Sequence, residues 1–286
     1  KASIDQLIDP SIDSNDVIRK IEEMTSTLRD ITRNEERPSQ KIASLISYLS
    51  QPNKWNAGKP YLYDLSDPLG TKIQNKLLGS YLQTHKGNCI SMPLLMAILG
   101  RRIGLEMSLV KAPMHIFVKY KDENGEWINV EATSYGTKLD QSYIDEGHIT
   151  QKAIKEGIYL RRLSKSEEFV AIAETVLEHL KIMSRQEDRI RLADKLLEMD
   201  PRNVEVMLHK GNAYYRLLKK EYLDKFRSFA DIPPERLDRY RYLHEQNIGW
   251  FAKAEELGWR EPSPEDDIKY LDSIKKAKLD KEGVDE

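Results

Sequence analysis

Three side chains of this sequence could together perform nucleophilic catalysis: the only cysteine, Cys89, and the downstream residues His115 and Glu131. A cysteine thiolate attacks carbonyl carbon, an imidazole takes and returns the proton, and a carboxylate orients the imidazole. These residue types in this order favour a cysteine-dependent acyl transfer. The simpler interpretation is that a lone cysteine is a small buried apolar residue, so the elements around it must decide.

Cys89 lies where the sequence predicts the start of a helix. Gly87 can end the preceding helix, Asn88 is a favourable N-cap residue, and apolar residues then recur at helical spacing as far as Gly104. Pro93 falls near the first turn, where its missing amide hydrogen costs least. A thiol at such a helix start faces the positive end of the helix dipole and unpaired backbone amides, which favour the thiolate.

A hairpin should carry the other two residues. The segments from Ala112 to Tyr120 and from Glu126 to Glu131 alternate and are rich in β-branched and aromatic residues, with a turn signal between them. If Tyr120 pairs with Glu126, His115 lies directly opposite Glu131 on one face of the sheet. A slip of one residue would separate the two side chains, so this register is a hypothesis.

The segments GNCISMPLL, APMHIFVKY and NVEATSYG, in this order and spacing, resemble the transglutaminase-like superfamily, whose members are related to papain-type cysteine peptidases. The resemblance covers about residues 60–164 and is greatest to a bacterial branch with appended tetratricopeptide (TPR) repeats. It implies an α+β fold, with the cysteine helix packed against an antiparallel sheet, and a thiolate–imidazolium pair. The third triad member is usually aspartate in the superfamily, whereas this chain has Glu131.

Acyl transfer also requires hydrogen-bond donors for the oxyanion of the tetrahedral intermediate. In papain-like enzymes a glutamine shortly before the cysteine is one donor, and Gln83 stands six residues upstream of Cys89. Gln83 fits equally well as a solvent-facing residue of a helix expected from Pro68 to about Thr84, after an N-cap at Asp67. The backbone amide of Cys89 is the other candidate donor.

The composition becomes strongly helical from Ser166 to about Gly258. Met207, Gly211 and Tyr214 fall at the large, glycine and tyrosine positions of a TPR first helix, and two repeats at most are legible. We therefore expect a transglutaminase-like domain with N-terminal helices over residues 1–165, an all-α TPR-like helical domain over 166–260, and a charged C-terminal tail over 261–286.

The bulk composition excludes several functions. Lys+Arg number 45 and Asp+Glu 47, so there is no electrostatic case for binding nucleic acid, and no apolar run is long enough to span a membrane. The composition is typical of a soluble protein, and a single cysteine together with a start at Lys1 leaves export to the periplasm or a cytoplasmic location open. Without C-x-x-C or H-E-x-x-H spacing around His85 and His148, neither a metal nor a cofactor is expected.

The sequence thus favours an enzyme that performs amide hydrolysis or transamidation on a protein or peptide, using Cys89, His115 and Glu131. The alternative is a catalytically inactive transglutaminase-fold binding module whose TPR-like repeats recruit a protein partner. Hydrolysis and transamidation differ in whether water or an amine reaches the thioester, and no motif in the sequence specifies that choice, the substrate or the oligomeric state.

Overall fold

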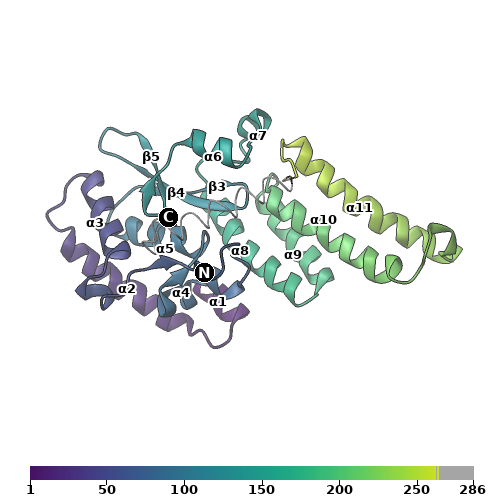
Figure 1. Ribbon diagram of the computed structural model, residues 1–286, viewed down its shortest axis with the longest axis horizontal. Coiled ribbons are helices and arrows are strands. Elements are labelled where there is room, and N and C mark those ends of the chain that lie inside the picture. Colours follow the sequence, from purple (N-terminus) through teal and green to yellow (C-terminus); the bar gives the residue numbers. More distant parts are fainter. Residues whose placement is uncertain (262, 264–286) are drawn as a thin grey trace, which may run out of the picture. The chain divides into compact units, whose positions relative to one another are not determined.

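The computed structural model describes residues 1–261 and 263, and they form two compact units (Figure 1). The first unit contains Lys1–Ile149 and Tyr159–Ser164, and the second contains Thr150–Ile158 and Lys165–Arg260. The short segment Thr150–Ile158 therefore groups with the helical part of the chain. Most of the charged tail expected over 261–286 lies outside the described residues.

The first unit contains helices beside its sheet. They are α1 (Ala2–Ile8), α2 (Ser14–Ile31), α3 (Pro38–Ser50), α4 (Leu78–Thr84), α5 (Ser91–Arg102) and α6 (Asp140–Glu146). The side chain of Asp13 caps α2 by accepting from the amide of Asn15 at 2.9 Å, and Pro38 occupies the start of α3, where no amide hydrogen is needed. Helices α2, α3 and α4 each contact α5, so the helix that follows Cys89 lies at the centre of this unit.

The sheet is antiparallel and has the strand order β3 (Met107–Ala112), β4 (His115–Lys121), β5 (Trp127–Glu131) and β6 (Gly136–Thr137). Helix α5 packs against β3 and β4, which makes this unit an α+β fold with the cysteine helix against an antiparallel sheet. The sequence did not predict β3. Ala112 ends that strand, and a two-residue turn at Pro113 and Met114 reverses the chain before β4 begins at His115.

The register between β4 and β5 differs from the predicted one by two residues. Tyr120 pairs with Ile128 and not with Glu126, because Asp122 closes a longer turn. The amide of Asp122 donates to the carbonyl of Glu126 at 2.9 Å, and its carboxylate accepts from the amide of Glu126 at 2.7 Å. A shift of two residues leaves every side chain on its original face, so the imidazole and the carboxylate of the candidate triad share a face at diagonal positions.

The single helix expected from Pro68 to Thr84 is also wrong. Helix α4 begins only at Leu78, after a 3₁₀ turn at Ile73–Lys76. Asp67 does not cap a helix here: its carboxylate accepts hydrogen bonds of 2.8–3.0 Å within the loop, from Thr71, Lys72 and Asn75. These bonds stabilise an irregular loop, which approaches the Cys89 turn at Gly70, a residue with φ of +60°. A short parallel pair, β1 (Leu62–Tyr63) with β2 (Lys86–Gly87), connects the same regions.

The second unit consists of helices, of which α8 to α11 each contact the next one in the sequence (Figure 1). They are α7 (Gln151–Glu156), α8 (Lys165–Ile182), α9 (Gln186–Met199), α10 (Val204–Leu218) and α11 (Leu237–Glu256). Gly211 permits the close packing of α10 on α11, because a Cβ atom there would lie 3.0 Å from the ring of Phe251. Among residues 1–261 and 263, no helix is both long and apolar enough to cross a bilayer.

Replacing Gly87 by alanine should destabilise the first unit. A Cβ atom at this position would overlap Ser91 Oγ and lie 2.7 Å from Cδ2 of the buried Tyr81 ring. Overpacking of this kind costs about 1–3 kcal/mol, so urea unfolding should begin at a clearly lower concentration. Gly136→Ala is the matched control, because its Cβ would meet only Ser134 Oγ, at an ordinary 3.6 Å. Equal stability of the Gly87→Ala variant and the native protein would contradict the prediction.

Candidate active site

Asn88 caps the turn that carries Cys89. Its Oδ1 accepts from the amides of Ile90 and Ser91 at 2.9 and 3.4 Å, and its carbonyl accepts from the amide of Met92 at 3.1 Å. The regular helix α5 begins at Ser91, so Cys89 lies in the capped turn immediately before it. Asn88 thus performs the capping function that its residue type predicts, although the helix itself starts later.

A second set of buried contacts holds this turn from the other side. Ser91 Oγ accepts from the amide of Asn88 at 3.1 Å and donates to the carbonyl of Asn75 at 2.7 Å. The side-chain nitrogen of Asn75 donates in turn to Asp64 and Asp67, at 2.9 and 2.8 Å. Burial raises the pKa of both carboxyls, but these hydrogen bonds lower the pKa more, so both carboxyls keep their charge. The loop before α4 and the turn before α5 are therefore one connected structure.

The thiol of Cys89 is partly exposed and not buried in the apolar core. Its Sγ lies 3.8 Å from the carbonyl oxygen of Met114, in the turn between β3 and β4 and directly before His115, and the thiol is one of the groups that raise the pKa of His115. Met114 has a φ of +54°, a conformation that non-glycine residues rarely adopt and that is enriched at functional sites. The turn thus brings the start of β4 to the cysteine.

His115 and Glu131 form an ion pair. The Nε2 atom of His115 lies 2.7 Å from Oε2 of Glu131, which leaves Nδ1 as the ring nitrogen available to Cys89. Burial lowers the pKa of His115, but the charge of Glu131 and the hydrogen bonds to Cys89 and Glu131 outweigh it, so the pKa rises to about 10. Burial raises the pKa of Glu131, yet the charge of His115 and several hydrogen bonds lower it to about 2. The pair is charged at neutral pH.

Two further residues bind the carboxylate of Glu131, and the sequence analysis missed both. Thr133 donates to Oε1 from its amide at 3.0 Å and from its hydroxyl at 2.7 Å. The hydroxyl of Tyr143, on α6, donates to Oε2 at 2.8 Å. A threonine two residues after a carboxylate is a local signal that could have been used, whereas no spacing rule connects Tyr143 with Glu131.

The other residues singled out from the sequence, the two candidate oxyanion donors and His85, lie outside the His115–Glu131 pair. Gln83 is exposed on α4, and its proposed contact with an oxyanion stays a prediction. No acceptor for the amide of Cys89 is found among the residues that the structure describes, and its contact with an oxyanion also stays a prediction. His85 stacks on Tyr61 with ring centroids 3.9 Å apart and bonds through Nδ1 to the carbonyl of Lys59, at 2.7 Å. The described part of the chain contains no cluster of histidine, cysteine and carboxylate side chains suited to a metal ion.

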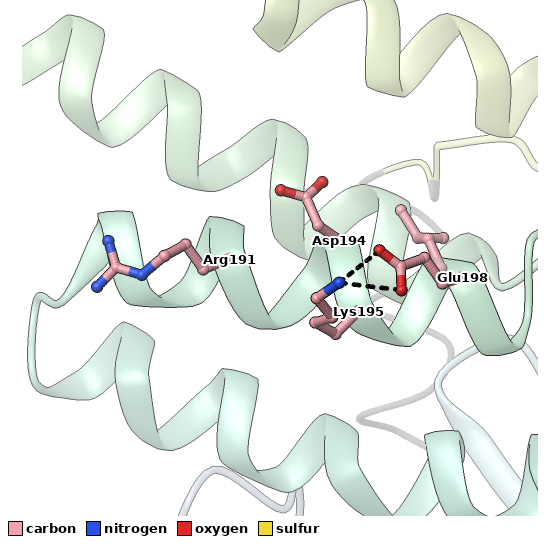
Figure 2. Close-up of a pocket in the computed structure, with 5 residues that line it drawn as sticks. Arg191, Asp194, Lys195 and Glu198 are labelled. Atoms are coloured by element: carbon pink, nitrogen blue, oxygen red, sulfur yellow. Dashed lines mark hydrogen bonds and ion pairs between the residues drawn. The ribbon is translucent and has the colours of Figure 1, made fainter.

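A depression on the second unit is a weaker candidate (Figure 2). Its lining comes from α9 alone: Arg191, Asp194, Lys195, Leu197 and Glu198. Lys195 donates to both carboxylate oxygens of Glu198, at 2.8 and 3.1 Å, and Arg191 points away from that pair. Asp194 is paired with Lys210 of α10. Because its charges already neutralise one another, this surface presents no convergent polar groups for a ligand.

The model of the transglutaminase-like superfamily matches residues 15–175, which is more than half of the chain. The chain belongs to the transglutaminase-like superfamily. The matched region includes the capped cysteine turn and the His115–Glu131 pair, so this superfamily fold brings the three candidate residues together. A UPF0162 protein of Buchnera aphidicola subsp. Baizongia pistaciae (strain Bp) is 23% identical over 211 residues, which cover 71% of this chain and 74% of that protein. No solved structure matches the chain significantly.

The His115–Glu131 ion pair should make the free energy of unfolding depend on pH in two ranges, one at acidic pH and one at alkaline pH. The folded pKa of Glu131 lies below its ordinary value of 4.5, so its contribution is present above pH 4.5 and is lost as the pH falls toward 2. The folded pKa of His115 lies above its ordinary value of 6.5, so its contribution is present below pH 6.5 and is lost as the pH rises toward 10.

We therefore expect Glu131→Gln to lower the free energy of unfolding most between pH 4.5 and 6.5, by about 3 kcal/mol, and less on either side. Urea unfolding of the native protein and the variant, measured from pH 3 to pH 10, checks this. Glu126→Gln, in the exposed turn between β4 and β5, is the control and should differ little from the native protein at any pH. A destabilisation by Glu131→Gln that does not vary with pH would show that the charges of the pair contribute nothing.

Proposed function

We propose that this protein is a cysteine-dependent acyl-transfer enzyme. The thiolate of Cys89 attacks the carbonyl carbon of an amide, and the imidazolium of His115 gives its proton to the departing amine as the carbon–nitrogen bond breaks. The product is a thioester on Cys89. Water or a second amine then gives a proton to His115 and attacks the thioester, which releases the thiolate and the acyl product. Glu131 holds the imidazole throughout.

One observation carries this proposal: His115 is paired with a buried, fully hydrogen-bonded carboxylate, while a partly exposed thiol bonds to the carbonyl of the residue before it and helps to raise the pKa of the imidazole. Burying a charged pair is unfavourable unless every polar atom is satisfied, so folding alone gives little reason to place one here. An imidazolium beside a thiol stabilises the thiolate, which is the nucleophilic form. Glu131 stands where the superfamily usually has aspartate. Its longer side chain is kept in place beside the imidazole because both of its carboxylate oxygens accept hydrogen bonds from neighbouring residues.

The oxyanion of the tetrahedral intermediate would be bound by the amide of Cys89, with Gln83 as the second proposed donor. The amide lies in the first turn before α5, where the helix dipole adds to the hydrogen bond. Gln83 would reach the oxyanion only after its side chain turns from solvent toward the thiol.

The substrate that we propose is a protein or a peptide, and the helical unit supports this choice. Helices α9, α10 and α11 pack on their neighbours, with Gly211 at the close contact between α10 and α11, and we interpret this packing as that of TPR-like repeats. Repeats of this kind present surfaces to protein segments. We therefore assign recruitment of a protein partner or substrate to this unit and acyl transfer to the Cys89 site.

The reactivity of the thiol should depend on His115. Iodoacetamide should label Cys89 below pH 7, and His115→Ala should slow labelling at pH 6 by about tenfold or more, because the variant lacks the imidazolium that favours the thiolate. His244→Ala, which removes an exposed histidine on α11, is the control and should not change the rate. Equal labelling rates in native protein and His115→Ala would refute the thiolate–imidazolium pair.

Acyl transfer itself can be tested with p-nitrophenyl acetate, an activated ester that acylates reactive thiols without requiring the natural substrate. A burst of p-nitrophenol stoichiometric with the protein is expected, absent in Cys89→Ala and roughly a hundredfold slower in Glu131→Gln. Addition of ethylenediamine then distinguishes the two reactions: faster turnover with the amine indicates a transamidase, and unchanged turnover a hydrolase. A folded protein with no stoichiometric burst would instead be the inactive binding module.

A further inference from the structure

The carboxylate of Glu131 has a partner that the triad does not include. The hydroxyl of Tyr143 donates to Oε2 at 2.8 Å, and this is the oxygen that His115 binds at 2.7 Å. The other oxygen, Oε1, is held by Thr133. Both oxygens are therefore anchored, and Tyr143 acts on the one that faces the imidazole.

Neighbouring side chains fix the ring of Tyr143. It is 4% exposed and stacks on Phe117 of β4, with ring centroids 4.1 Å apart and an interplanar angle of 12°. The ammonium group of Lys138 lies 4.6 Å from the ring centroid. Burial and the charge of Glu131 raise the pKa of Tyr143, so its hydroxyl keeps the proton that it donates.

The helix that carries Tyr143 is tied to the two strands of the ion pair. Asp140, at the start of α6, accepts from Lys119 of β4 at 3.1 Å and from the side chain of Asn129 of β5 at 2.8 Å. Lys119 and Asn129 are both buried, so these bonds connect α6 to the sheet beneath the candidate site. The position of the hydroxyl is thus determined by the strands that also carry His115 and Glu131.

Stacking does not explain the hydroxyl group. A phenylalanine at this position would stack on Phe117 equally well, and within the described part of the chain the hydroxyl bonds to Glu131 alone. Its effect is therefore on the carboxylate: it stops Oε2 from rotating away from His115, and it takes part of the negative charge that would otherwise face the imidazole.

We propose that Tyr143 is a positioning residue of this site, which holds Oε2 of Glu131 in line with Nε2 of His115. A catalytic effect of Tyr143 rests on the proposed function, but its effect on the contact between Glu131 and His115 can be tested without turnover. The hydroxyl of Tyr143 acts through Glu131, and its ring also faces the imidazole of His115, with ring centroids 6.0 Å apart.

The test compares two tyrosine-to-phenylalanine variants. Tyr143→Phe removes the hydroxyl that binds Glu131, whereas Tyr135→Phe removes a hydroxyl that donates to the carbonyl of Tyr61 at 2.5 Å and does not touch the carboxylate. Both tyrosines lie in the same unit, on either side of β6 in the sequence. Any general effect of losing a buried hydroxyl should appear in both variants, and an effect on Glu131 only in the first.

The main readout is the proton resonance of the His115 ring N–H that is bonded to Glu131, observed by NMR far downfield and assigned by its absence in His115→Ala. We expect Tyr143→Phe to shift or broaden this resonance and Tyr135→Phe to leave it unchanged. The burst with p-nitrophenyl acetate should slow by about tenfold in Tyr143→Phe only, since misplacement of the imidazole lowers the acylation rate. If Tyr143→Phe does not fold, Asp140→Asn, which loosens α6, replaces it with the same expected result.

An unchanged resonance in Tyr143→Phe, or equal changes in both variants, would overturn the positioning role. The two proposals fail separately. If native protein gives no burst but the resonance responds to Tyr143→Phe alone, the positioning role holds and the acyl-transfer function is wrong. If the burst is present and Tyr143→Phe changes neither readout, the acyl-transfer function holds and the positioning role is wrong.

Discussion

The ion pair between the half-buried His115 and the buried Glu131 is the interaction on which the candidate site depends. Taking two charges out of water costs more than their attraction returns unless the remaining hydrogen-bonding positions are also filled. The structure meets this requirement around the carboxylate, where Thr133 and Tyr143 supply the other donors. The strand pair, the turn after β5 and helix α6 must therefore all be in place before the imidazole can be held beside the thiol.

The cysteine is held by a separate set of contacts, which are mostly local. Asn88 and Ser91 bond to one another around the turn, and Gly87 leaves the space that Ser91 and Tyr81 occupy. The two sets meet where Cys89 reaches His115 and the carbonyl of Met114. Cys89 is thus held before α5 and His115 at the start of β4. Because both positions are fixed by the fold, the two groups are oriented before a substrate binds.

Membership of the transglutaminase-like superfamily establishes the fold, but chemistry is a property of the site. In this chain the partly exposed thiol, the charged imidazole and the anchored carboxylate are the groups on which the proposed acyl transfer rests. The α9 depression of the second unit offers no comparable arrangement among its described residues, since Lys195 pairs with Glu198 and Asp194 with Lys210 of α10. The role of the second unit in the proposal is therefore to bind a protein or peptide, while the first unit performs the reaction.

The sequence by itself determined the features that depend on a few adjacent residues: the capped cysteine turn, the α+β class, and the placement of His115 and Glu131 on neighbouring strands. It was wrong where an aspartate side chain bonds to groups a few residues further along the chain, inside its own loop or turn. Asp67 binds within its own loop and does not start a helix, and Asp122 lengthens the turn so that Tyr120 pairs with Ile128. The predicted meeting of imidazole and carboxylate survived because side chains alternate with a period of two, and a two-residue shift preserves the face. Only the tertiary structure brought Tyr143 to Glu131, since packing of α6 on the sheet, and no spacing in the chain, sets that distance.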